Sequence, residues 1–109
     1  MKTEKLHAGA AFPRLPVQNP EGETIDISKP TGEADWQMVV VYRGRHCPLC
    51  TKFLNSLAGF RERLQTIGVD MAAVSADSAA QLAEHQSRLD VNFPLFHGLT
   101  LEQMQELGL

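Results

Sequence analysis

Residues 38–54 read M-V-V-V-Y-R-G-R-H-C-P-L-C-T-K-F-L, and this stretch decides the fold of the chain. A short apolar run rich in β-branched residues leads through a basic turn into apolar residues at helical spacing. The protein's two cysteines, Cys47 and Cys50, stand where the helical spacing begins. The sequence therefore predicts a strand followed directly by a helix, with both thiols at the junction.

This stretch and the residues after it predict a strand–helix–strand unit. Residues 37–42 are almost wholly apolar, which is typical of a central strand covered on both faces in a parallel sheet. A helix is expected from Pro48 to Ile67, and residues 69–75 predict a second strand. About thirty residues separate the two strands, a spacing that favours a right-handed crossover between parallel neighbours. The apolar stripe expected to face the sheet consists of Phe53, Leu57, Phe60, Leu64 and Ile67.

Shorter elements are expected before this unit. Residues 1–11 are expected to form a loose lead-in. Residues 15–27 alternate apolar and polar side chains on both sides of the turn sequence N-P-E-G, which predicts a peripheral two-stranded hairpin. The polar loop 28–36 is then expected to bring Trp36 to the edge of the core.

Two further helices are expected after the unit. Asp77 or Ser78 is placed to cap a helix that runs through Leu89. The segment 100–103 has the capping-box pattern T-x-x-Q and predicts the start of a short terminal helix.

The composition is that of a globular domain, with 43% hydrophobic and 21% charged residues. A net charge of −3 without an extended basic patch argues against a nucleic-acid partner. The N-terminus lacks the apolar segment of a signal peptide and no stretch is long enough to span a membrane, so a cytoplasmic location is expected. In a reducing compartment, a C-x-x-C pair is expected to be catalytic or metal-binding rather than a structural disulfide.

The position of the two thiols favours nucleophilic chemistry. Pro48 fits the first helical position, so Cys47 is expected at the N-cap and Cys50 in the first turn. Free backbone N–H groups and the helix dipole favour a thiolate there, and the cations Arg43 and Arg45, with His46 when protonated, act in the same direction. Such sites lower a thiol pKa from about 8.5 into the range of ~3.5 to 7.5. At least one cysteine is therefore expected to be a nucleophile.

Two other interpretations of the cysteines remain open. Both could be small buried residues without a chemical role. Alternatively, they could bind zinc, which would require His46 and one of His7, His85 or His97, although these have no recognisable ligand spacing. His85 is expected on the solvated face of its helix and His97 in a loop. The order H-C-P-L-C excludes a c-type haem attachment site.

Three segments together resemble a known family. They are V-V-V-Y-R-G-R-H-C-P-L-C at 39–50, M-A-A-V-S-A-D at 71–77 and F-P-L at 93–95. The chain, over about residues 9–109, resembles the peroxiredoxin-like branch of the alkyl hydroperoxide reductase and thiol-specific antioxidant family, within the thioredoxin-fold superfamily. The resemblance implies an α/β thioredoxin-like fold, a central βαβ unit with an N-terminal hairpin, in one domain over residues 1–109. Family members continue with an antiparallel strand pair and a helix, so this domain is expected to be incomplete.

The resemblance also implies roles for the site residues. Family members carry a Pro-x-x-x-Thr-x-x-Cys pattern, in which Cys50 matches the peroxidatic cysteine, Cys47 replaces the threonine and Arg43 replaces the proline. Cys50 would then reduce a hydroperoxide and Cys47 would resolve the product, with Arg43, Arg45 and His46 in support. An external dithiol such as a thioredoxin-type protein would restore the pair. Neither a metal nor an organic cofactor is implied.

Two alternative functions remain open beside this thiol peroxidase. In a thiol–disulfide oxidoreductase of thioredoxin type, Cys47 would be the nucleophile, because it is the first cysteine of the pair. In a non-catalytic binding module, a partner subunit would complete the fold. A homodimer or larger homo-oligomer is expected in either case.

Overall fold

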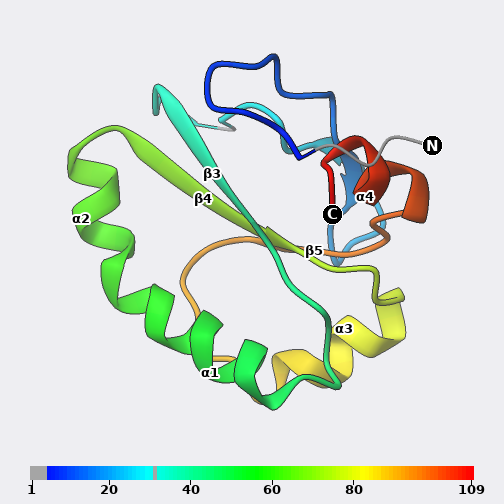
Figure 1. Cartoon of the computed structure of the whole chain (residues 1–109). Coiled ribbons are helices and arrows are strands. Elements are labelled where there is room, and N and C mark those ends of the chain that lie inside the picture. The colour runs from blue at the N-terminus through cyan, green and yellow to red at the C-terminus, as the bar shows by residue number, and fades with distance from the viewer. Residues whose placement is uncertain (1–4, 31) are drawn as a thin grey trace.

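Parallel strands form the centre of the computed structural model, which describes residues 5–30 and 32–109 (Figure 1). Strand β3 (Trp36–Val41) pairs in parallel with β4 (Val69–Val74), so that Met38 lies opposite Met71. Strand β5 (Leu95–Phe96) pairs in parallel with the other side of β4. The expected βαβ unit is therefore confirmed.

The prediction that the first strand of this unit is central is wrong. Among the described residues the strand order is β3-β4-β5, which makes β4 the central strand and leaves β3 at the edge. The apolar run of β3 reflects packing on its two faces: Met38 and Val40 contact one core cluster and Val39 contacts the other. A strand can have both faces buried and still have a hydrogen-bonded neighbour on one side only. An apolar run therefore does not by itself make a strand central.

The connection between β3 and β4 is helical but not one continuous α-helix. Helix α1 (Pro48–Leu57) passes through a 3₁₀ turn, η1 (Ala58–Phe60), into α2 (Arg61–Thr66). Gly68, with φ of +79°, allows the chain to turn into β4.

The stripe expected to face the sheet is wrong for three of its five residues. Phe53, Phe60 and Ile67 are exposed, and Ile67 is 70% exposed. The buried residue of α1 is Leu54, next in sequence to Phe53. Two apolar series run along this segment at helical spacing, and the one containing Leu54 faces the sheet. Leu57 and Leu64 of the expected stripe do pack against the core, in the hydrophobic cluster that contains Leu54.

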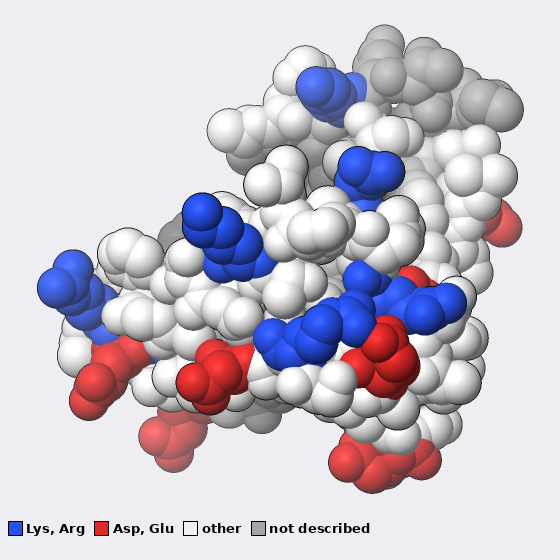
Figure 2. Space-filling model, turned by 90° about the horizontal axis from the view of Figure 1, so that it is seen from below, with Lys and Arg blue, Asp and Glu red and all other residues white. Residues whose placement is uncertain are grey.

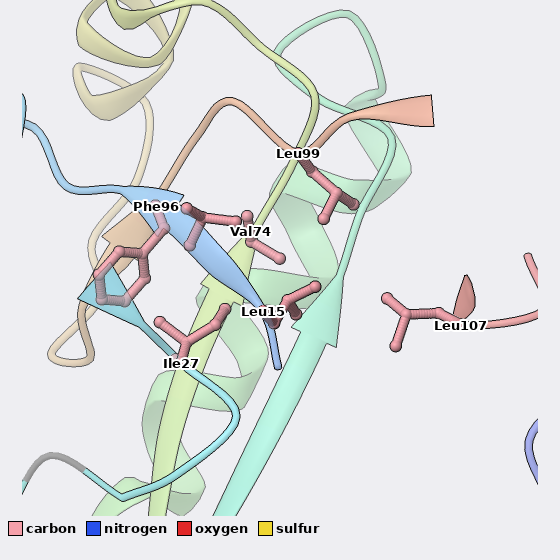
Figure 3. Packing of buried hydrophobic residues seen from close by; sticks show 8 residues of the cluster. Leu15, Ile27, Val74, Phe96, Leu99 and Leu107 are labelled. Atoms are coloured by element: carbon pink, nitrogen blue, oxygen red, sulfur yellow. The ribbon is translucent and has the colours of Figure 1, made fainter. Parts of the chain in front are cut away.

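Two hydrophobic clusters lie on opposite faces of the sheet, because successive residues of a strand point to opposite sides. Met71 and Ala73 of β4 pack with α1 and with α3 (Ala79–Gln86). Ala72 and Val74 pack with the hairpin β1 (Pro16–Gln18) and β2 (Thr24–Asp26), and with Leu107 just after α4 (Leu101–Glu106). Figure 1 shows the corresponding arrangement, with α1, α2 and α3 on one side of the sheet and the hairpin with α4 on the other. Figure 3 shows the second cluster, in which Leu15, Ile27 and Phe96 gather around Val74.

The local signals for turns and caps are largely confirmed. In the hairpin, Val17 lies opposite Ile25 in an antiparallel pair. Ser78, rather than Asp77, caps α3, which ends at Gln86 and not at Leu89. The capping box of α4 forms as expected from the segment 100–103.

Two expectations near the N-terminal half have a different outcome. Trp36 is 70% exposed, so the prediction that it reaches the edge of the core is wrong. Of the expected lead-in, residues 1–4 lie outside the described part, and residues 5–11 form neither helix nor strand.

The surface carries charges of both signs. On the face in Figure 2, Lys and Arg are interspersed with Asp and Glu rather than gathered in one patch. Within the described ranges, no helix combines the length and apolar character needed to cross a membrane.

Candidate active site

The two thiols meet at the start of α1. Cys47 is its N-cap residue, with an extended backbone (φ −106°, ψ 101°), and Pro48 is the first helical residue, as predicted. The Sγ atom of Cys47 accepts a hydrogen bond from the backbone N–H of Cys50, with an N–S distance of 3.2 Å. Both cysteines are free thiols in the structure. A side chain in this position satisfies one of the otherwise unpaired N–H groups of the helix start.

The surroundings shift the two thiol pKa values in opposite directions. A hydrogen bond from the Cys50 thiol, the backbone N–H of Cys50 and the guanidinium of Arg43 lower the pKa of Cys47. Burial, its hydrogen bond to Cys47 and the negative charge there raise the pKa of Cys50. The site therefore favours the negative charge on Cys47 over the negative charge on Cys50.

The basic turn before Cys47 is held by the end of the neighbouring strand. The backbone N–H of Arg45 donates to Oδ2 of Asp77 at 2.9 Å. Gly44 has a φ of +125°, and a Cβ on it would lie 2.5 Å from Oδ1 of the same carboxylate. Only glycine fits both the backbone conformation and the available space. The backbone N–H of Cys47 then donates to the Gly44 carbonyl at 3.2 Å, so the turn leads directly into the helix cap.

Asp77 and Gly44 are site residues that residue spacing did not predict. The available signal was topological: parallel strands end at the same edge of a sheet, so S-A-D after β4 lies beside the turn after β3. Asp77 is buried there instead of capping α3.

The three supporting residues are placed differently. Arg43 acts on Cys47 through its charge and lines a cavity together with His46. The guanidinium of Arg45 instead lies 3.6 Å from the carboxylate of Glu84 on α3. Arg88 joins this exposed group by donating to the Arg45 carbonyl at 2.9 Å. Arg45 thus contributes its backbone to the turn while its side chain points to α3.

A largely apolar cavity opens beside Cys50. Its volume is about 590 Å³. Cys47 is only 7% exposed and does not line it. The cavity is lined by Cys50, Arg43, His46, Val40, Val41, Tyr42, Leu49, Phe53, Ala76, Leu99, Met104 and Leu109. Of the two thiols, the one that faces this cavity is that of Cys50.

Two of the other histidines, His85 and His97, are buried. His85 is fully buried and its Nε2 lies 2.7 Å from Oγ1 of Thr51, so the prediction of a solvated His85 is wrong. It shares the inner face of α3 with Leu82, three residues earlier, and a polar residue on an apolar face escapes a search for apolar spacing. His97 is buried too, with Nε2 3.2 Å from the Asn19 carbonyl. Over residues 5–30 and 32–109, no group of three or more His, Cys, Asp or Glu side chains could hold a metal ion.

The parallel βαβ core and the thiol pair at its strand-to-helix turn define a thioredoxin-fold protein with a C-x-x-C site. The model of the AhpC/TSA family matches residues 8–109, and the chain belongs to this family. Among curated proteins, none matches this chain.

Solved structures share the fold at low sequence identity. A peroxiredoxin-like protein from Aquifex aeolicus is 18% identical, with a TM-score of 0.76 over 96% of this chain and 60% of that one. A yeast mitochondrial 1-Cys peroxiredoxin is 16% identical, with a TM-score of 0.69 over 84% of this chain and 46% of that one. A thiol:disulfide interchange protein from Bacteroides sp. is 13% identical, with a TM-score of 0.71 over 91% and 63%. The chain thus spans between 46% and 63% of the length of these proteins.

Proposed function

We propose that this protein is a thiol–disulfide oxidoreductase in which Cys47 is the nucleophile and Cys50 the resolving thiol. The observation that carries the proposal is the hydrogen-bonded pair at the start of α1, whose two thiol pKa values are shifted in opposite directions. An ionised sulfur beside a protonated one is what a two-step exchange needs, because the first attacks and the second completes the reaction.

The exchange would proceed in two balanced steps. The Cys47 thiolate attacks one sulfur of a substrate disulfide, forms a mixed disulfide and releases the other substrate sulfur as a thiolate. Cys50 then loses its proton and attacks the Sγ of Cys47, which releases the second substrate sulfur. The substrate gains two electrons, and the Cys47–Cys50 dithiol becomes a disulfide.

A second candidate is the reduction of a hydroperoxide by Cys50. Two observations favour it: membership of the AhpC/TSA family, and the position of Cys50 on the apolar cavity with Arg43 and His46. Cys50, after giving its proton to the Cys47 thiolate, would attack the terminal oxygen of the hydroperoxide and become a sulfenic acid. The O–O bond breaks, and the leaving oxygen takes a proton from solvent to become an alcohol or water. Cys47 would then condense with the sulfenic acid, releasing water and forming the same disulfide.

Both reactions require partners. An external dithiol, such as a thioredoxin-type protein in the cytoplasm, would reduce the Cys47–Cys50 disulfide and start the next cycle. The unpaired edge of β3 within the described residues supports assembly into a homo-oligomer, since an exposed apolar edge strand tends to pair with another chain.

Two assays on single-cysteine variants test the proposal. The rate of insulin reduction with dithiothreitol should fall to background in Cys47→Ser. In Cys50→Ser the rate should be lower than in the parent protein, and a mixed disulfide between Cys47 and the substrate should accumulate. Stopped-flow consumption of hydrogen peroxide and of an organic hydroperoxide measures the second candidate in the same variants. Peroxide consumption that requires Cys50, without insulin reduction, would overturn the proposal in favour of the peroxidase. Activity in neither assay would favour the non-catalytic binding module.

A further inference from the structure

A fully buried histidine is linked through one threonine to the N-cap residue of α1. His85, on the inner face of α3, places Nε2 2.7 Å from Oγ1 of Thr51 on α1. Oγ1 of Thr51 lies 3.4 Å from the carbonyl oxygen of Cys47, and the Thr51 backbone N–H donates to the same oxygen at 3.1 Å. A continuous chain of polar atoms therefore joins the core of the protein to the backbone of the N-cap cysteine.

The hydrogens available on Thr51 and His85 decide which group donates at each step of this hydrogen-bond chain. The hydroxyl of Thr51 has one proton, so it donates either to Nε2 of His85 or to the Cys47 carbonyl. Nδ1 of His85 is buried and has no hydrogen-bond partner among the residues that the structure describes. If Nδ1 carried the proton, a buried N–H would be left without an acceptor, which costs more than a bare ring nitrogen. The favoured tautomer therefore carries its proton on Nε2, donates to Thr51 and leaves the Thr51 hydroxyl free to donate to Cys47.

We propose that His85 is a positioning residue for Cys47 and acts through Thr51. The neutral imidazole fixes the Thr51 hydroxyl, and the hydroxyl fixes the Cys47 carbonyl, which holds the N-cap backbone in the conformation that places Sγ on the Cys50 N–H. This inference rests on the proposed function in that it takes Cys47 as the reactive thiol. It adds a pair of residues, Thr51 and His85, whose link to Cys47 runs through its backbone carbonyl.

The surroundings of His85 keep the imidazole neutral. The ring of Tyr42 lies 5.9 Å from the His85 ring, centroid to centroid, and both side chains are buried. Burial lowers the pKa of His85, and the charge of Arg88 lowers it further, against the opposite effects of Asp77 and Glu84. A neutral ring can donate from one nitrogen without placing a charge in the core.

The test compares the pKa of Cys47 in Thr51→Val and His85→Leu with that of the parent protein. The measurement is pH-dependent alkylation with iodoacetamide, with the two cysteines resolved by peptide fragmentation. Each variant should raise the Cys47 pKa by about half a unit, which is roughly a threefold loss of thiolate below that pKa. The conservative variants Thr51→Ser and His85→Gln keep a hydroxyl and an N–H donor, so the Cys47 pKa in each should equal that of the parent protein. The double variant should shift the pKa no more than the larger single effect, because both residues belong to one chain of hydrogen bonds.

Two results would overturn the inference. A Cys47 pKa unchanged in both Thr51→Val and His85→Leu, with only lower thermal stability, would show a merely structural role. Additive shifts in the double variant would show that the two residues act separately. The proposed function is judged by a different comparison, the order of the Cys47 and Cys50 pKa values in the parent protein, so a failure of one idea is distinguishable from a failure of the other. If His85→Leu does not fold, Thr51→Val alone decides.

Discussion

Cys47 and Cys50 differ because of their positions in one turn of helix, and not because of their sequence neighbours alone. The sequence predicts both thiols at the helix start and leaves the choice of nucleophile open, while the family pattern points to Cys50. The N-cap geometry gives Cys47 a backbone N–H and a thiol as hydrogen-bond donors, and it places Cys50 beside the negative charge of Cys47. Hydrogen-bond direction within a turn is not encoded in residue spacing, which is why the structure was needed to separate the two.

At the residue scale, the contact between Gly44 and Asp77 should be intolerant of a methyl group. Gly44→Ala places a Cβ against the carboxylate at a positive φ, so we expect a loss of about 2–4 kcal/mol in the free energy of unfolding. Gly22→Ala is the matched control, because Gly22 has a φ of +85° with no atom within 4 Å of its Cβ position. Its cost should be about 1 kcal/mol. Equal losses in urea denaturation would show that Asp77 does not restrict the turn.

Asp26 predicts a pH dependence of stability. Its carboxylate accepts hydrogen bonds from the Ser28 hydroxyl and from the backbone N–H groups of Leu15 and Ser28, which lower its pKa to about 2. Because the folded pKa is below the unfolded value, the carboxylate stabilises the fold above about pH 4, and this stabilisation is lost as the pH falls towards 2. Asp26 is partly exposed, so we expect about 1–2 kcal/mol after allowing for solvent screening.

Urea denaturation of the parent protein and Asp26→Ala between pH 7 and pH 2 measures this effect. The difference in free energy of unfolding should shrink across the acid range, whereas the exposed Asp90→Ala should show a small difference at every pH. A difference for Asp26→Ala that stays constant down to pH 2 would contradict the assignment.

At the element scale, the sequence predicted the presence of the helices and strands well. It predicted less well which face of each element is buried. The strands, the hairpin, the caps at Ser78 and Thr100 and the N-cap at Cys47 follow from local turn chemistry and apolar runs, and all are present. The buried side of α1 could not be chosen from spacing, because two apolar series have helical periodicity. The edge position of β3 could not be chosen either, since hydrogen-bond partners are a property of the whole sheet.

The corrected face of α1 makes a direct prediction for two adjacent residues. Leu54 is fully buried against the sheet and Phe53 is 55% exposed. Leu54→Ala should lower the free energy of unfolding by about 2–5 kcal/mol, because it leaves a cavity in the core. Phe53→Ala should cost less than about 1 kcal/mol. Thermal or urea denaturation measures the loss in free energy of unfolding for each variant. A larger loss for Phe53→Ala than for Leu54→Ala would show that the face of α1 expected from the sequence is the buried one.

At the scale of the whole molecule, the described residues supply the βαβ core, the thiol pair and both hydrophobic clusters. They span 46% to 63% of the length of the two peroxiredoxin-type proteins and the thiol:disulfide interchange protein that share the fold. The expectation that the chain is a single domain stays a prediction. The edge of β3 is the most consequential feature at this scale, because its outer hydrogen-bonding groups have no strand partner among the described residues.

An unpaired β3 edge predicts association between copies of the chain. Size-exclusion chromatography with light scattering should give a mass that rises with concentration towards that of a dimer. Val41→Lys places a charge at the end of β3 and should shift the equilibrium towards monomer, since charged residues protect edge strands from pairing. Glu62→Ala, at an exposed position on α2, changes the net charge in the same direction as Val41→Lys and is the control. A parent protein that stays monomeric across the concentration range would refute the association.

The central claim is that Cys47, not Cys50, is the sulfur poised to react. Its most direct test is the pH dependence of alkylation of each cysteine in the reduced parent protein, with the modified site identified by peptide fragmentation. The geometry predicts that Cys47 reacts with a pKa below that of an ordinary thiol and that Cys50 reacts only at higher pH. If Cys50 were alkylated at the lower pH and Cys47 at the higher, the assignment of the nucleophile would be contradicted.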